Sequence, residues 1–229
     1  MFRSGLKILD EATNGGIQPG SIVEIYGEPD CGKTALALWY CKQYLSNTEN
    51  LAGWLLSEQP SAISQFKWAS IDPSSVIVKS PSVQNPLDIA GFLVEEGVNL
   101  VVIDGIASIV NKDMEEVDKI LSASLPSLKE KIKATNSLLV LCNQSRTVLG
   151  SNQIKPASSC APLLKLVDYR IKLTPGATLI SKAKGVVDSS VGMRVRFDIY
   201  RMNNKAVSIS GKFNLLWAGG LRDIRDLKV

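Results

Sequence analysis

The chain has 229 residues, of which 45% are hydrophobic and 21% charged, a composition typical of a globular α/β protein with a full core. It contains no histidine, which excludes Ser-His and Cys-His nucleophile systems and histidine-containing zinc sites. No apolar run is long enough to span a bilayer, and the first residues show no secretion signal. We therefore expect a single cytoplasmic domain over residues 1–229, with no membrane partner.

The net charge of +4 is unevenly distributed along the chain. Between Lys129 and Lys212 there are fifteen lysines and arginines against four acidic residues. A basic half favours a polyanionic partner such as nucleic acid, although a solvated cationic surface would have the same composition. The four cysteines are far apart and form no metal-binding pattern, so we expect structural thiols.

The chain begins with a short predicted helix, followed by a strand and a glycine-bounded turn. Residues 4–12 carry apolar side chains at helical spacing, and the segment 13–20 breaks that pattern. A β-branched strand at 22–26 leads into a sequence of the form G-x-x-x-x-G-K-[ST], which is followed by a predicted helix at 35–45. A strand before this motif and a helix after it are the context that a phosphate-binding loop requires.

Each residue type in this motif has a physical task. Two glycines let the backbone curl so that its N–H groups point at phosphate oxygens, and the helix N-terminus favours the same anion. Lys33 is expected to act in catalysis as a positive charge at the β- and γ-phosphates, and the Thr34 hydroxyl is a suitable ligand for Mg²⁺. The residues predicted to bind the nucleotide here are Gly27, Glu28, Pro29, Asp30, Cys31, Gly32, Lys33, Thr34 and Ala35.

The central part of the chain alternates between continuous apolar strands and helices. Strands are predicted at 51–56, 76–78, 100–104 and 138–142. Helices are predicted at 60–70, at 87–96 after a cap at Asn85, and at 114–134 with an interruption at Pro126. This alternation predicts a mostly parallel central sheet with helices on both faces.

The last third of the chain has a different pattern. Residues 145–161 are polar and without periodicity, and they are predicted to form a long loop. Short strands joined by turns are predicted at 169–173, 179–182, 193–200, 206–210 and 213–217. We expect these strands to extend the sheet as antiparallel hairpins.

Polar residues at the ends of three predicted strands complete the candidate site, because ligands collect at the carboxyl ends of parallel strands. Asp104 would hold Mg²⁺ through water, together with Thr34. Glu58 could orient or deprotonate an attacking water, and Gln144 could sense the γ-phosphate. The alternative is that each of these side chains simply caps the end of its strand.

The ordered set of motifs resembles the RecA-type ATPase cores, with the bacterial RecA recombinases as the most similar branch. The resemblance covers almost the whole chain and is carried by residues 4–12, 15–20, 22–27, 143–146 and 213–221. It implies an α/β fold with a RecA-like P-loop NTPase core, a mostly parallel sheet and an antiparallel C-terminal extension. It also implies ATP and Mg²⁺ as cofactors, single-stranded DNA as a partner, and self-association or association with another RecA-family protein.

The resemblance assigns roles to individual residues as well. Glu58 takes the place of the catalytic glutamate, and Gln144 that of a catalytic glutamine that links the γ-phosphate to the DNA loops. Trp217 takes the place of an aromatic residue near the adenine. Arg146 falls where a loop arginine meets the DNA backbone, and Lys155 lies in the same loop.

The likeness is looser in other places. A cation on the antiparallel strands, Arg201 or Lys205, would reach the phosphates of a neighbouring subunit. The segment 110–118, in place of the first DNA loop, is short and acidic and would repel phosphates, and the second loop lacks the family's paired glycines. The family's N-terminal docking helix and strand and its C-terminal domain have no counterpart in the sequence, which leaves filament assembly open.

Three functions follow from these residues. The first hypothesis is a core-only, RecA-like, DNA-dependent ATPase that acts in DNA recombination and repair. The alternative is a RecA paralogue that regulates or loads another recombinase, switches with nucleotide and hydrolyses little. A third hypothesis, a hexameric helicase-like motor of the same superfamily, agrees less well with the RecA-like strands at the end of the chain.

Overall fold

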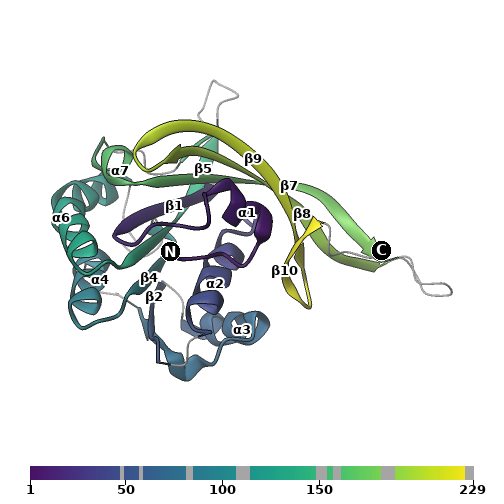
Figure 1. Cartoon of the computed structure of the whole chain (residues 1–229), viewed down its shortest axis with the longest axis horizontal. Coiled ribbons are helices and arrows are strands. Elements are labelled where there is room, and N and C mark those ends of the chain that lie inside the picture. Colours follow the sequence, from purple (N-terminus) through teal and green to yellow (C-terminus); the bar gives the residue numbers. More distant parts are fainter. Residues whose placement is uncertain are drawn as a thin grey trace.

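The fold is built on one mixed β-sheet (Figure 1). The computed structural model describes residues 1–46, 49–56, 59–80, 85–106, 114–147, 154–156, 161–181 and 189–224. The strands are β1 (Ser21–Gly27), β2 (Ala52–Leu56), β3 (Val76–Lys79), β4 (Leu100–Asp104), β5 (Leu138–Thr147), β6 (Ile154–Pro156), β7 (Tyr169–Ser181), β8 (Ser189–Met202), β9 (Lys205–Leu216) and β10 (Gly220–Asp223). Their order in the sheet is β10-β9-β8-β7-β1-β5-β4-β2-β3, and β6 pairs with β5.

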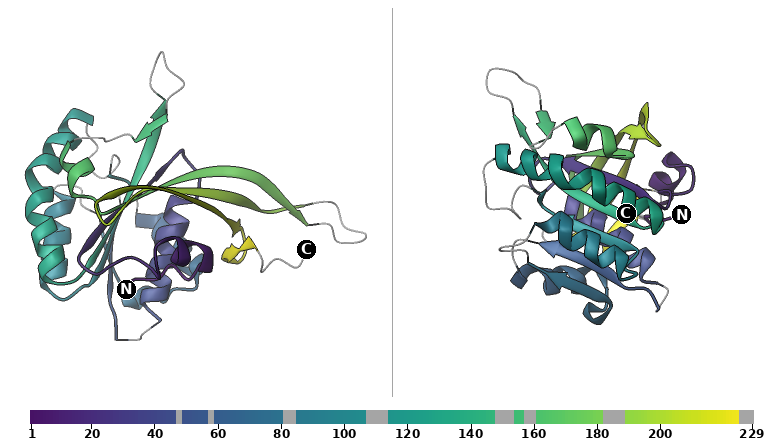
Figure 2. Two further views of the ribbon diagram at one scale, coloured as in Figure 1. Left: turned by 45° about the horizontal axis from the view of Figure 1, so that its top comes forward. Right: turned by 90° about the vertical axis from the view of Figure 1, so that its left-hand side faces the viewer.

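Helices cover both faces of the sheet where its strands are parallel (Figures 1 and 2). The helices are α1 (Lys7–Ala12), α2 (Lys33–Tyr44), α3 (Gln59–Ala69), α4 (Pro86–Glu95), α6 (Met114–Ala134) and α7 (Ala161–Leu166), with a 3₁₀ turn at Pro73–Ser75. The first three pack on one face and the last three on the other. This arrangement, with its antiparallel extension, confirms the predicted α/β fold class. In the described part of the chain, no helix is both long and apolar enough to cross a membrane.

Helix α6 runs without a break, so the predicted interruption at Pro126 is wrong. A proline in a helix interior removes one backbone donor and costs about 3 kcal/mol. Pro126 is exposed, however, and the opposite side of the helix buries a row of apolar side chains against the sheet. These side chains are Val117, Leu121, Leu125, Leu128 and Ile132. Burial of each stabilises the fold by about 1.5–3 kcal/mol. The five side chains together therefore stabilise the helix by more than the proline destabilises it.

The predicted loop at 145–161 is also partly wrong. Strand β5 continues to Thr147 and forms a hairpin with β6 that projects beyond the sheet (Figure 2), and α7 begins at residue 161. Residues 148–153 and 157–160 of this segment lie outside the described residues. In the acidic segment 110–118, α6 begins at Met114 as predicted, while residues 107–113 lie outside the described part. Polar composition alone does not separate a loop from a projecting hairpin.

Three long strands replace the five short ones predicted after residue 169. Strands β7, β8 and β9 have 13, 14 and 12 residues and pair antiparallel, which confirms the predicted pairing but not the predicted number and length. Asn203 and Asn204 have φ of 50° and 62°, as a tight two-residue hairpin turn requires. Strand β7 passes Pro175 with a shift in register, because a bulge lets a strand contain proline without ending. The short strand β10 was not predicted.

Candidate nucleotide-binding site

Strand β1 ends in the predicted phosphate-binding loop. Gly32, with φ of 96°, is the N-cap of α2, and Asp30 also has a positive φ of 57°. A Cβ at Gly27 would lie 2.4 Å from the carbonyl oxygen of Leu173 and 2.6 Å from Cys31 Sγ. The loop therefore curls tightly against β7, and it requires glycine at both ends of the motif.

The ammonium group of Lys33 lies within the curl of this loop. Its Nζ donates to the carbonyl oxygens of Glu28 at 2.6 Å and Gly27 at 3.2 Å, and it is 3.8 Å from Cys31 Sγ. These acceptors hold the positive charge at the loop, where an anion would meet it. Burial raises the pKa of the Cys31 thiol more than Lys33 lowers it, so this thiol stays neutral beside the charge.

Thr34 and Asp104 meet at the carboxyl ends of β1 and β4. The Thr34 hydroxyl donates to Asp104 Oδ1 at 3.2 Å. A hydroxyl and a carboxylate side by side are the hard oxygen ligands that Mg²⁺ prefers, so these residues fit the metal that a phosphate-binding loop implies. Burial raises the pKa of Asp104, while hydrogen bonds from Thr34 and Cys142 and the charge of Lys33 lower it. A divalent cation would stabilise the ionised form of this half-buried carboxylate.

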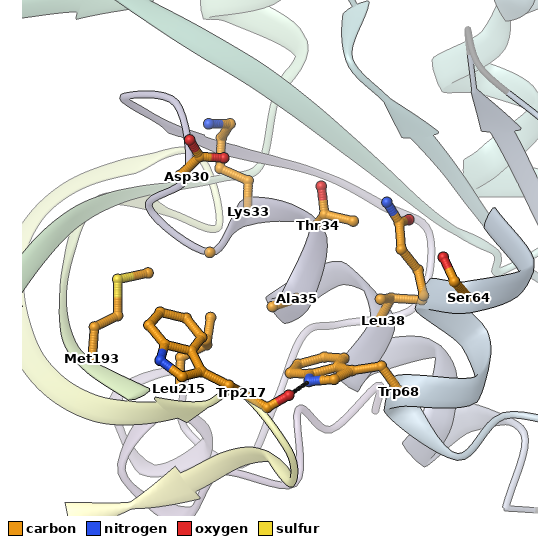
Figure 3. Close-up of a pocket in the computed structure, with 12 residues that line it drawn as sticks. Asp30, Lys33, Thr34, Ala35, Leu38, Ser64, Trp68, Met193, Leu215 and Trp217 are labelled. Carbon is orange, nitrogen blue, oxygen red and sulfur yellow. Dashed lines mark hydrogen bonds between the residues drawn. The ribbon is translucent and has the colours of Figure 1, made fainter. Parts of the chain in front are cut away.

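A cleft of about 650 Å³ extends from the loop toward the antiparallel strands (Figure 3). Asp30, Lys33 and Thr34 lie at one end of it. The other end is lined by aromatic and apolar side chains, among them Trp68 of α3 and Trp217 after β9. This volume is within the range typical of small-molecule sites, and a polar end opposite an apolar end matches the two ends of a nucleotide.

Hydrogen bonds hold the two tryptophans at the apolar end. Trp68 Nε1 donates to the Trp217 carbonyl oxygen at 2.8 Å, which ties α3 to the turn after β9 (Figure 3). Trp217 Nε1 donates to Ser190 Oγ of β8 at 3.0 Å. The Trp68 ring also contacts that of Trp39 on α2, with 6.0 Å between their centroids. The structure thus brings Trp217, predicted from the resemblance, into the same cleft as the phosphate-binding loop.

Comparison with known proteins agrees with this architecture. A sequence model described as the RecA N-terminal domain matches residues 1–199. The chain belongs to the RecA family.

Two curated relatives show how far the similarity to RecA extends. Protein RecA of Francisella philomiragia subsp. philomiragia is 32% identical over 233 residues, which cover 95% of this chain and 63% of the relative. Protein RecA of Francisella tularensis subsp. novicida is 32% identical over 160 residues, which cover 64% of this chain and 44% of the relative. The chain therefore spans less than two thirds of the length of these RecA proteins.

The other residues to which the RecA resemblance assigns roles fall in three places. Gln144 is exposed and is the register partner of Gly27, so it lies beside the start of the loop. Arg146 and Lys155 are register partners in the hairpin of β5 and β6, which brings the backbones of the two predicted DNA-binding residues together. Glu58 lies outside the described residues. The roles of all four residues stay predictions.

Arg201, one of two cations considered for contact with a neighbouring RecA subunit, is engaged within its own chain. Its guanidinium donates to the carbonyl oxygens of Leu164 and Lys165 at the end of α7, and to Asn204 Oδ1. A cation is favourable at a helix C-terminus, where it satisfies carbonyl groups that have no partner in the helix. Lys205, the other cation considered, is exposed.

Sequence reasoning missed several residues at the apolar end of the cleft. Trp68 of α3 is one of them; it is partly buried against the same core as Phe66 and Ala69, so its position in the helix gives no separate signal of a ligand. Met193 and Leu215 also line the cleft, but neither is distinguished from ordinary strand residues by its sequence context.

Proposed function

We propose that this RecA-family protein is a Mg²⁺-dependent ATPase that binds single-stranded DNA and acts in cytoplasmic DNA recombination and repair. The observation that carries the proposal is the contact between Thr34 and Asp104 beside the loop that holds Lys33. Lys33 and Thr34 line one end of a nucleotide-sized cleft, and the oxygens of Thr34 and Asp104 are suitable ligands for Mg²⁺, which supports the proposal. The chain spans only part of its RecA relatives, so filament formation and strand exchange stay predictions.

The side chains would divide the chemistry between them. Lys33 would bind the β- and γ-phosphates, and Thr34 and Asp104 would hold Mg²⁺, which neutralises the charge on the phosphate oxygens when it is bound. Glu58 would orient the attacking water and accept its proton. Gln144, beside the loop, would contact the γ-phosphate and respond to its loss.

DNA would bind at the hairpin of β5 and β6. Arg146 and Lys155 are register partners there, and Arg146 is two residues beyond Gln144, the register partner of Gly27. Cations that neutralise phosphates release counterions, so the affinity should fall steeply with salt. In this proposal, β5 carries both Gln144, which would contact the nucleotide, and Arg146, which would contact DNA.

ATP turnover with Mg²⁺, measured with and without single-stranded DNA, tests the enzyme directly. We expect turnover that rises when DNA is added. Lys33→Ala should lose nucleotide binding, whereas Glu58→Gln should retain it and stop hydrolysis, because the amide cannot accept the proton. Hydrolysis by Glu58→Gln at the parent rate would show that the role of Glu58 is wrong.

DNA binding is tested separately by its salt dependence. Arg146→Ala should weaken the binding of a labelled oligonucleotide and reduce the slope of log K against log salt by about one. Lys7→Ala is the control, because Lys7 is an exposed cation on α1 that pairs with Glu11. An unchanged slope for Arg146→Ala contradicts the assignment.

A nucleotide-switched regulator of another recombinase is the second candidate. The acidic segment 110–118 favours it, because acidic residues in place of a DNA-binding loop would repel the backbone. Size measurement with ATP and DNA separates the candidates. Long polymers support the recombinase, a small species that hydrolyses little supports the regulator, and a closed ring supports a helicase-like motor.

A further inference from the structure

A buried polar cluster joins three neighbouring strands beside the phosphate-binding loop. Glu24 of β1 is completely buried. Its Oε1 accepts a hydrogen bond from Asn143 Nδ2 of β5 at 2.8 Å, and its Oε2 accepts one from Arg170 Nε of β7 at 2.6 Å. The Arg170 guanidinium also lies over the ring of Tyr26, 5.2 Å from its centroid. One carboxylate therefore connects β5, β1 and β7 in the middle of the sheet.

Packing alone does not account for a carboxylate at this position. The other buried side chains on this face of β1 and β5 include Ile22, Leu139 and Leu141, which pack with α6 and α7. A buried ion pair is costly to desolvate, and replacing it with apolar residues of similar volume is often neutral or stabilising. What an apolar residue could not do is bind donors on two different strands, which fixes both strands relative to β1.

The donor from β5 occupies a particular place in the chain. Asn143 immediately precedes Gln144, whose register partner is Gly27 at the start of the loop. Arg146 follows in the hairpin of β5 and β6. The bond between Glu24 and Asn143 therefore joins β1 to β5 one residue before Gln144, the residue of β5 that pairs with Gly27 at the start of the loop.

We propose that Glu24 is a positioning residue that couples nucleotide binding to DNA binding. Its carboxylate holds Asn143, so a displacement of β1 at the loop is passed to β5 and to the hairpin that carries Arg146. Strand β5 cannot slide along β1 without losing a charge-assisted hydrogen bond in a buried position. This inference rests on the proposed function, because it requires that the protein bind both nucleotide and single-stranded DNA.

The chain contains a second buried ion pair that serves as a matched control. Lys129 of α6 donates to Asp168 Oδ2, which also accepts a hydrogen bond from the backbone N–H of Ile22 at 2.7 Å. Both side chains are about as buried as those of Glu24 and Arg170. The partners of Asp168 are Ile22, Lys129 and Asn204, none of which lies on β5, whereas Glu24, the fourth of the seven residues of β1, accepts from Asn143 of β5. Asp168→Asn thus makes the same chemical change as Glu24→Gln without altering the hydrogen bond to β5.

The test measures how nucleotide changes DNA affinity. The affinity for a fluorescently labelled single-stranded oligonucleotide is determined by anisotropy, with and without a slowly hydrolysed ATP analogue and Mg²⁺. For the parent protein we expect a change of about tenfold. For Glu24→Gln the change should fall to about twofold or less, while the affinity for the analogue alone stays within about twofold of the parent. Asp168→Asn should lower the melting temperature about as much as Glu24→Gln does. It should nevertheless keep the tenfold effect of nucleotide on DNA affinity that is expected for the parent.

Glu24→Gln removes the charge but keeps an oxygen that can accept from Asn143, whereas Asn143→Ser shortens the donor side chain and removes the bond itself. Asn143→Ser should therefore lose the coupling at least as fully, and it carries the test if Glu24→Gln does not fold. Retention of the parent's coupling by folded Asn143→Ser overturns the inference. Equal loss of coupling in Asp168→Asn also overturns it, because the effect would then follow from reduced stability. A parent protein that binds both ligands without coupling overturns this inference alone, whereas one that binds neither refutes the proposed function.

Discussion

The two ends of the nucleotide cleft are constructed in different ways. The phosphate end comes from one continuous segment, residues 27–35, together with the end of β4. The apolar end is assembled from segments that are far apart in the sequence, with Trp68 on α3, Met193 on β8 and Trp217 after β9. Charge and backbone conformation determine the first end, and tertiary packing determines the second.

This difference has consequences for how each end responds to change. The loop is held by its own backbone, with Gly32 in the left-handed region and Lys33 bonded to carbonyl groups of the loop. The apolar end depends on the hydrogen bond from Trp68 to the Trp217 carbonyl, and so on how α3 packs against the turn after β9. We therefore expect phosphate-end variants to depend on salt, and apolar-end variants to depend on the stability of distant contacts.

The largest effect on nucleotide affinity is expected for Lys33→Ala. Loss of a charge-assisted bond to phosphate should weaken ATP binding by about 3 kcal/mol, or roughly 100-fold in Kd. The loss should shrink at high salt because part of it is electrostatic. Titration calorimetry at two salt concentrations measures both effects. Lys42→Ala, which changes another cation on α2, is the control, and equal losses for both variants would contradict a specific role of Lys33.

Asp104→Asn tests the metal side of the phosphate end. The pKa of Asp104 is raised by burial, so keeping it ionised destabilises the nucleotide-free protein above that pKa. The variant should therefore be more stable than the parent at neutral pH. This gain should diminish as the pH falls through the raised pKa and vanish below the ordinary value of 3.8.

The same variant should lose the dependence of nucleotide binding on Mg²⁺, because the amide does not attract the cation. Chemical denaturation at several pH values and calorimetry with and without Mg²⁺ measure the two effects. A variant that is less stable than the parent at neutral pH, or that keeps the Mg²⁺ dependence, would show that Asp104 is structural.

Trp217→Ala tests the apolar end, where the effect should be smaller. Loss of stacking on a base should cost about 1.5 kcal/mol, or roughly tenfold in Kd, with little change between low and high salt. Trp217→Phe should recover most of the affinity. Trp54→Phe is the control for fluorescence titrations, since Trp54 is a fully buried residue of β2 whose ring packs against Phe66 of α3. Quenching by nucleotide that survives in Trp217→Ala and vanishes in Trp54→Phe would contradict the placement of the base.

Gly220→Ala should have the smallest effect on affinity and a larger one on stability. Its φ is +76°, and a Cβ there would lie 2.0 Å from the ring of Trp39, which contacts Trp68. We expect about 1 kcal/mol from the backbone and ~1–3 kcal/mol from the clash, with about twofold weaker nucleotide binding. Gly97→Ala is the matched control, because its φ is +88° but nothing lies within 4 Å. Equal melting temperatures for the two variants would show that the ring contact is unimportant.

Much of the fold follows from local patterns in the sequence. The cap at Asn85, whose side chain accepts from Leu87 N–H, and the buried strand β4 were both expected from residue type and order. The errors arose where distant packing overrides a local signal. Pro126 does not interrupt α6, and β7 continues past Pro175, because in each case the neighbouring elements stabilise the longer segment.

The phosphate end of the cleft could be predicted from local sequence, because a glycine-bounded turn between a strand and a helix has its conformation encoded in adjacent residues. The hydrogen bond between Trp68 and the Trp217 carbonyl, and the bonds of Arg201 to the carbonyl groups at the end of α7, could be seen only in the folded chain. The same holds for Glu24, whose partners lie 119 and 146 residues away along the chain. Contacts between segments so far apart depend on strand order and register, which the packing of the whole sheet decides.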